Sequence, residues 1–219
     1  INGSFEDFDR QLYGIAGSIV TLTVQRKDVP EPFQVIVQRD LVDKAFRGFS
    51  VYDVYEDRNG AIWFTLYNGP KAGEVIRYDV QATNGSPSTA WQIYTEKDGL
   101  DQGWARRVLQ TRDGTIWVIS HGIGGVNWLK GDTWRYIRLD QVIQDANDLN
   151  TSILETSDGT LWVGSHGGRL CTFRDGNWKV YLPWDVSLPE ARLIGLLEAR
   201  DGALWVAGLG EEVIRIDCG

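Results

Sequence analysis

The stretch Glu155–Ser165, with the sequence ETSDGTLWVGS, occurs in four similar copies along the chain. The other copies are Glu56–Thr65 (EDRNGAIWFT), Gln110–Ser120 (QTRDGTIWVIS) and Glu198–Gly208 (EARDGALWVAG). Each has an apolar run, an Asn-Gly or Asp-Gly step, and a second apolar run with a tryptophan three residues after the glycine. Such a step between two apolar runs predicts a β-hairpin, because both residues tolerate the positive φ of a tight turn.

The four copies recur at intervals of 43 to 54 residues, counted between their tryptophans Trp63, Trp117, Trp162 and Trp205. Repetition at this spacing, with strands rather than helices in between, is typical of four-stranded β-propeller blades. In the third repeat we expect strands at 152–156, 160–165, 169–174 and 178–182. The last repeat stops after its third expected strand.

The apolar pattern predicts that neighbouring blades cover one another. A strand with apolar residues on both faces, such as the one containing Ile153 and Leu154, must lie between two layers, and stacked blades provide them. We expect the repeat tryptophans to be buried there. An acidic or amide residue also falls seven positions before each tryptophan: Glu56, Gln110, Glu155 and Glu198. These residues either line a central channel or cap a turn, and a position repeated in every blade favours the structural role.

Composition limits the classes of partner. The net charge is −8, which argues against nucleic acid or an anionic membrane surface, because neutralising phosphates needs a basic face. No apolar run is long enough to span a bilayer. Cys171 and Cys218 are predicted to be buried thiols, with a disulfide between them as the alternative. The absence of methionine and the incomplete last repeat predict a piece of a longer protein.

Residues 1–43 do not follow the repeat and form a predicted first domain. A helix is expected from Ser4 to Tyr13, followed by two alternating segments, 18–25 and 33–39, that predict an antiparallel strand pair. The segments INGSFEDF, LYGIAGSIVTLTVQR and FQVIVQRD resemble the C-terminal half of a bacterial PDZ domain. The resemblance implies a peptide-binding groove, but the loop that takes the peptide carboxylate would lie before Ile1.

Residues 44–219 form the predicted second domain, which from residue 50 onward resembles the two-component regulator propeller repeats. The shared pattern is Glu-Asp, then Asn-Gly or Asp-Gly, then Ile-Trp or Leu-Trp, a later Trp-x-x-Tyr and a closing Lys-Asp-Gly-Leu, as in Trp91–Leu100 (WQIYTEKDGL). The resemblance implies a predominantly all-β fold, a partial β-propeller of about four blades with the last incomplete, beside a small α+β segment at the N-terminus. It also implies a sensor region, periplasmic or extracytoplasmic, of bacterial hybrid histidine kinases.

The candidate ligand-binding residues lie where the repeats differ. His121 and His166 stand four residues after their repeat tryptophans, where the other copies have Tyr67 and Leu209. Two such histidines could flank a metal or a substrate, but a turn residue held by hydrogen bonds is the simpler interpretation. The segments between blades contribute the other candidates: Trp104, Arg106, Arg107, Trp184 and Arg192. Trp and Arg carry much of the binding energy at interfaces, while burial between blades is an equal alternative for the tryptophans.

We therefore expect a non-catalytic recognition module that binds a protein, peptide or small molecule on the propeller face, without a cofactor or metal. Two alternatives remain open. One is a substrate-recruiting accessory region of a PDZ-containing protease. The other is a propeller enzyme similar to the streptogramin lyases, with His121 and His166 as its candidate residues.

Overall fold

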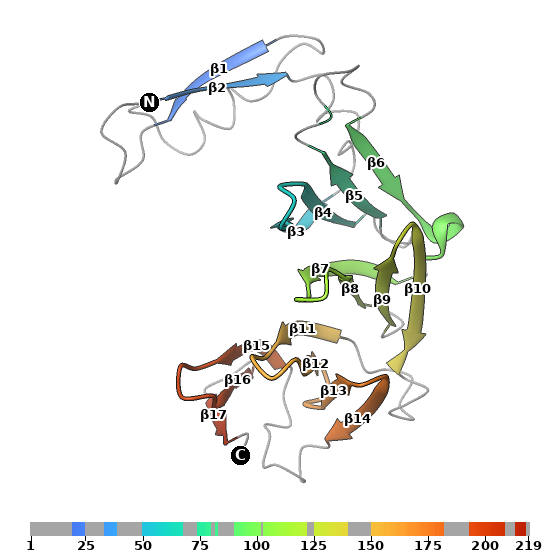
Figure 1. The fold of residues 1–219 in the computed structure, drawn as a ribbon, viewed down its shortest axis with the longest axis vertical. Helices are drawn as coiled ribbons and strands as arrows, with labels where there is room; N and C mark the ends of the chain where they lie inside the picture. The colour runs from blue at the N-terminus through green and yellow to red at the C-terminus, as the bar shows by residue number, and fades with distance from the viewer. Residues whose placement is uncertain are drawn as a thin grey trace. The chain divides into compact units, whose positions relative to one another are not determined.

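The computed structural model describes residues 19–24, 33–38, 50–67, 74–79, 82, 90–101, 103–121, 125–139, 150–181, 193–208 and 213–217. The chain forms two compact units, Ile1–Phe49 and Ser50–Gly219. Figure 1 shows the strands of both units in chain order. Among the described residues there is no helix of the length and apolarity that a membrane span needs.

The first unit contains an antiparallel strand pair. Strand β1 (Ile19–Val24) pairs with β2 (Phe33–Gln38), and Ile19 lies opposite Gln38. This confirms the strand pair predicted from the alternating pattern. The expected helix from Ser4 to Tyr13 lies outside the described residues. The PDZ-like half-domain and its boundary at residue 43 therefore stay predictions.

The second unit consists of four antiparallel sheets, each with its strands in chain order, which we call blades 1 to 4. Blade 1 contains β3 (Ser50–Glu56), β4 (Ile62–Tyr67), β5 (Glu74–Tyr78) and β6 (Trp91–Tyr94). Blade 2 contains β7 (Trp104–Gln110), β8 (Ile116–His121), β9 (Gly125–Lys130) and β10 (Thr133–Arg138). Blade 3 contains β11 (Asn150–Glu155), β12 (Leu161–Ser165), β13 (Leu170–Arg174) and β14 (Asn177–Tyr181). Blade 4 contains β15 (Leu193–Glu198), β16 (Leu204–Gly208) and β17 (Val213–Ile216).

This architecture confirms the predicted all-β propeller blades. The strands of blade 3 begin and end within two residues of their predicted bounds. Blade 4 has three strands among the described residues, as its sequence indicates. A short 3-10 helix, η3 (Glu96–Asp98), connects blade 1 to blade 2 and is capped by the hydroxyl of Thr95.

The repeat turn differs in one respect from the sequence prediction. In the repeat turn of blade 3 only Gly159 has a positive φ, +88°, and the loop spans three residues, 157–159. The backbone N–H of Gly159 donates to the carbonyl of Thr156, and that of Thr156 to the carbonyl of Thr160. This is a type I turn that ends in a left-handed glycine. The tight turn with two positive φ angles occurs instead at Asp175 (+51°) and Gly176 (+82°), between β13 and β14.

The repeat tryptophans of blades 1 to 3 are anchored to their own turns. The indole N–H of Trp162 donates to the hydroxyl of Thr156 at 3.1 Å. Trp117 and Trp63 make the equivalent bonds to the side chains of Thr111 and Asp57, the residues directly before their turns, at 3.0 and 2.8 Å. The three rings are 2 to 9% exposed, which confirms the predicted burial in blades 1 to 3. Trp205 of blade 4 is 38% exposed, so the prediction is wrong for this tryptophan. In blade 4 the equivalent acceptor position is occupied by Ala199.

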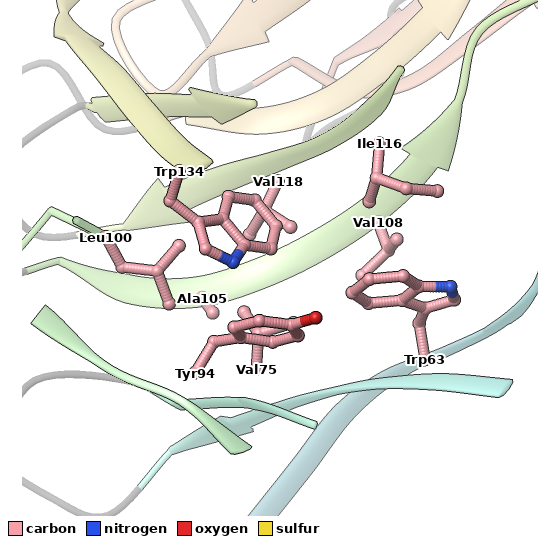
Figure 2. Packing of buried hydrophobic residues seen from close by; sticks show 9 residues of the cluster. All are labelled: Trp63, Val75, Tyr94, Leu100, Ala105, Val108, Ile116, Val118 and Trp134. Atoms are coloured by element: carbon pink, nitrogen blue, oxygen red, sulfur yellow. The ribbon is translucent and has the colours of Figure 1, made fainter. Parts of the chain in front are cut away.

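The hydrophobic core lies between successive blades. Figure 2 shows the first cluster, in which Trp63 and Tyr94 of blade 1 contact Trp134 of blade 2. The rings of Trp63 and Tyr94 are stacked at 5.9 Å, and Trp134 meets Tyr94 edge-on at 5.4 Å. Similar clusters join blade 2 to blade 3 and blade 3 to blade 4. Cys171 is buried in the second of these, while Cys218 lies outside the described residues.

A repeated hydrogen bond joins the turns of neighbouring blades, and we call it the turn staple. The first turn residue of one blade donates its backbone N–H to the side chain that ends the first strand of the next blade: Arg58 to Gln110, Arg112 to Glu155 and Ser157 to Glu198. The guanidinium of Arg112 also donates to the carbonyl of Ser157 at 2.6 Å and to that of Thr156. The repeated Glu or Gln is therefore a turn-capping residue between blades.

Candidate functional site

The site begins at the edge where the first strand of each blade starts and the second strand ends. In blade 2, Trp104 pairs with His121, and in blade 1, Ser50 pairs with Tyr67. Tyr67 and His121 therefore hold equivalent positions, as the repeat spacing indicates. A β-bulge interrupts the first strand of each blade just beyond this edge. The bulge residues are Tyr52 in blade 1 and Arg106 in blade 2.

Five side chains from blades 1 and 2 meet at this edge, and we call them the edge cluster: Tyr52, Tyr67, Trp104, Arg106 and His121. The ring of Trp104 stacks on that of His121, with centroids 5.4 Å apart and planes inclined by 16°. Tyr67 meets Trp104 edge-on at 4.8 Å, and Tyr52 lies 5.6 Å from Tyr67. The guanidinium carbon of Arg106 lies 5.5 Å from the centre of the Tyr52 ring.

The edge cluster is accessible to a ligand. Tyr52 is exposed, and the other four side chains are half-buried. Its rings offer flat apolar contact area, and Arg106 adds a positive charge that its contact with Tyr52 holds in place. Such a surface suits aromatic, apolar or acidic groups of a ligand.

Arg107, although adjacent in sequence to Arg106, has a different role. Its guanidinium lies 3.5 Å from a carboxylate oxygen of Asp53 in blade 1. The other oxygen of Asp53 accepts the backbone N–H of Val108 at 3.0 Å. Arg107 therefore belongs to the junction between the first strands of the two blades. This contact does not support its predicted role in ligand binding.

Of the remaining predicted site residues, the structure describes only His166, and it is not part of the edge cluster. His166 is exposed in the turn that follows β12, and it takes no part in these ring contacts. Trp184 and Arg192 lie outside the described residues. In the part of the chain that the structure describes, no three His, Cys, Asp or Glu side chains gather closely enough to hold a metal ion.

A buried aspartate, Asp101, belongs to a hydrogen-bond network next to the edge cluster, and the sequence did not predict this role. Asp101 is 3% exposed, and its carboxylate accepts the backbone N–H of Gly103 at 3.0 Å. The backbone N–H of Asp101 donates to the side-chain oxygen of Asn127, whose amide donates to the hydroxyl of Ser120 at 2.9 Å. Since Gly103 and Ser120 directly precede Trp104 and His121, this network fixes the strand ends that carry the stacked pair.

Burial raises the pKa of Asp101, and the Ser120 hydroxyl and the Gly103 N–H oppose that rise. Asp101 also borders a cavity of about 460 Å³, together with Tyr136 and Arg138. The packing at its carboxylate is close, because a Cβ placed on Gly125 would lie 1.5 Å from an Asp101 oxygen. The hydrogen bond between Asp101 and Asn127 joins residues 26 positions apart in sequence, so no local motif predicts it.

Four sheets of this kind, stacked through buried aromatic clusters, define a β-propeller repeat protein. The family described as two component regulator propeller matches residues 144–167, which include the third copy of the repeat turn. No curated protein sequence matches the chain.

Several solved structures share the fold. A catalytically inactive virginiamycin B lyase from Staphylococcus aureus, solved with quinupristin, is 14% identical with a TM-score of 0.62, and the match covers 91% of this chain and 56% of the lyase. The extracellular domain of a hybrid two component system from B. thetaiotaomicron is 14% identical with a TM-score of 0.55, covering 90% of this chain and 23% of that protein. YCF48 bound to a peptide is 13% identical with a TM-score of 0.55, and the match covers 76% of this chain and 50% of YCF48.

Because the sequence identities are only 13–14%, these similarities show a shared fold and nothing more. The chain spans little more than half of the lyase and about a quarter of the two component protein.

Proposed function

We propose that the propeller unit is a non-catalytic recognition module, and that it binds a peptide or protein segment at the edge cluster. The observation that carries this proposal is the grouping of Trp104, Tyr67 and Arg106, from two blades, around one accessible edge. Trp, Tyr and Arg are the side chains that most often dominate the binding energy of protein interfaces.

The arrangement of His121 favours binding over catalysis. Its ring is stacked on Trp104, so it adds to a flat aromatic surface. A general base needs a reacting proton within hydrogen-bond reach and an electrophilic group on the opposite side. His166, the second candidate of the lyase alternative, belongs to a turn of the next blade and does not join this surface.

The comparisons support an extracytoplasmic sensing role. The matched repeat is described as a two component regulator propeller, and one structural neighbour is the extracellular domain of a two component system. Another neighbour has a bound peptide. We infer that the unit senses or recruits a peptide or protein outside the cytoplasm of a bacterium, as part of a signalling receptor.

A random peptide library displayed on phage and panned against the whole chain tests the proposed site. We expect the selected peptides to be rich in aromatic and acidic residues and to lose at least about tenfold in affinity when both Trp104→Ala and Arg106→Ala are present. Tyr136→Ala is the matched control, because Tyr136 is an exposed aromatic residue on the outer strand of blade 2. Peptides that bind the double variant and the control equally would refute the proposal.

A further inference from the structure

The side chain that packs on the repeat tryptophan differs among the first three blades. In blade 1, Tyr94 on the outer strand stacks on Trp63, with ring centroids 5.9 Å apart and planes inclined by 10°. In blade 3, Tyr181 stacks on Trp162 at 6.0 Å and 22°. The strand registers place Ile137 at the equivalent position of blade 2. Blade 2 therefore has an isoleucine where both neighbouring blades supply an aromatic ring.

A cavity of about 350 Å³ borders Ile137, between blades 2 and 3. We call it the aromatic pocket, because its walls include Trp117 and Trp128 of blade 2 and Phe173 and Trp178 of blade 3. The ring of Trp117 lies 5.6 Å from that of Trp128 and 5.4 Å from that of Phe173, while Trp178 lies 5.1 Å from Phe173. Such a volume is within the range of small-molecule sites, and the packed rings hold its shape.

Lys130 brings a positive charge to the aromatic pocket. It lines the pocket at the end of β9, and its side chain is exposed. In blade 3 the equivalent residue, Arg174, is paired with Asp158 at 2.6 Å. No ion pair joins Lys130 to any residue that the structure describes, and the oxygens of Asp113, the counterpart of Asp158, accept hydrogen bonds within their own turn. The Lys130 ammonium can therefore pair with an anionic group of a ligand.

We propose that the aromatic pocket binds a small aromatic carboxylate. Its ring lies beside Trp117, as the ring of Tyr94 lies beside Trp63, and its carboxylate pairs with Lys130. The mostly aromatic walls favour a flat ring over a sugar, because buried sugar hydroxyls would need several polar partners. This site is separate from the edge cluster and does not depend on the function proposed for it.

Three probes with the same ring and different charges test the proposal: phenylacetate, phenylacetamide and phenethylamine. In an NMR titration of the whole chain, we expect phenylacetate to bind with a dissociation constant between about 10 µM and 1 mM. Phenylacetamide should bind at least about fivefold more weakly because it lacks the charge, and phenethylamine more weakly still. The indole N–H signals of Trp117, Trp128 and Trp178 should shift, whereas that of Trp63 should not.

Two variants locate the ligand. Lys130→Gln should weaken phenylacetate at least about fivefold and leave phenylacetamide unchanged, since only the charged pair is lost. Ile137→Tyr supplies the ring that blades 1 and 3 have at this position, so it should abolish binding of both probes. Lys179→Gln is the matched control, because Lys179 is an exposed lysine of blade 3 that contacts Tyr181 and does not line the aromatic pocket. It should leave both affinities unchanged.

The proposal is refuted if phenylacetate shifts none of the three indole signals at up to about 10 mM. It is also refuted if Lys130→Gln binds phenylacetate as tightly as the wild type does, or if phenethylamine is the tightest of the three probes. Lys130 is exposed, so its substitution tests the site even if Ile137→Tyr disturbs the fold. Peptide binding at the edge cluster should survive Lys130→Gln, so failure of this proposal and failure of the proposed function are distinguishable.

Discussion

Replacing Trp162 by alanine tests the central claim about the repeat, that its tryptophan holds two blades together. A tryptophan side chain buries roughly 150–250 Å², equivalent to roughly 4–6 kcal/mol at about 25 cal/mol per Å². Trp162 is only 9% exposed, so nearly all of this free energy of burial applies to it. Its indole N–H also donates to the hydroxyl of Thr156. Since the cavity relaxes only in part, we expect Trp162→Ala to lower the free energy of unfolding by about 4–5 kcal/mol.

Trp205→Ala is the matched comparison within the same chain. Trp205 is 38% exposed, and the turn position that supplies an acceptor in blades 1 to 3 is Ala199 in blade 4. We expect a loss of about 2–3 kcal/mol, because less area is buried and no indole hydrogen bond to the turn is broken. Urea unfolding followed by circular dichroism, at a concentration where the chain is monomeric, measures both losses. Equal losses, or a loss below about 1 kcal/mol for Trp162→Ala, would contradict the assigned packing.

Three further predictions concern polar groups. Gly125→Ala should destabilise the protein by about 1–3 kcal/mol because the new Cβ collides with the Asp101 carboxylate, and Asp101→Ala should recover part of that loss in a double-mutant cycle. Thr156→Val leaves the Trp162 indole N–H without its acceptor and should cost about 1–3 kcal/mol in thermal or urea unfolding. The hydroxyl of Thr156, ahead of the Thr160 and Arg174 contacts, helps to hold the pKa of Asp158 at about 2. The ionised Asp158 carboxylate stabilises the folded state above the unfolded-state pKa, and this stabilisation is lost as the pH falls from about 4 towards 2. The melting temperature of Asp158→Asn should therefore fall less than that of the wild type between about pH 4 and about pH 2. Melting temperatures that fall in parallel for the two proteins would contradict this.

Much of the fold could be predicted from the sequence because its signals are local. The Asp-Gly pair at 158–159 and the tryptophan three residues later lie within one hairpin, so one stretch encodes both the turn and the ring that packs beside it. The details of the turn were less predictable. An Asp-Gly pair suits both a two-residue turn and a three-residue turn ending in glycine, and the strand register decides between them.

The candidate site could be predicted only in part. Trp104, Arg106 and His121 stand out because they interrupt the repeat, and the structure brings them together with Tyr52 and Tyr67. Arg107 shows the limit of such reasoning. A bulge between Ala105 and Arg107 directs Arg106 to the aromatic rings and Arg107 to Asp53, although the two arginines are sequence neighbours.

The sequence by itself determined the hairpin, its repetition and the strand order of each blade, because turn chemistry and apolar alternation act over a few consecutive residues. Only the tertiary structure decided which equivalent residues differ in environment. Trp162 and Trp205 follow the same turn motif, yet one is buried and the other exposed, since burial depends on the presence of a neighbouring blade. Asp101 and Asn127 are likewise distant in sequence, and the fold of blade 2 brings them together. Contacts between distant segments depend on tertiary packing, so no local sequence pattern predicts them.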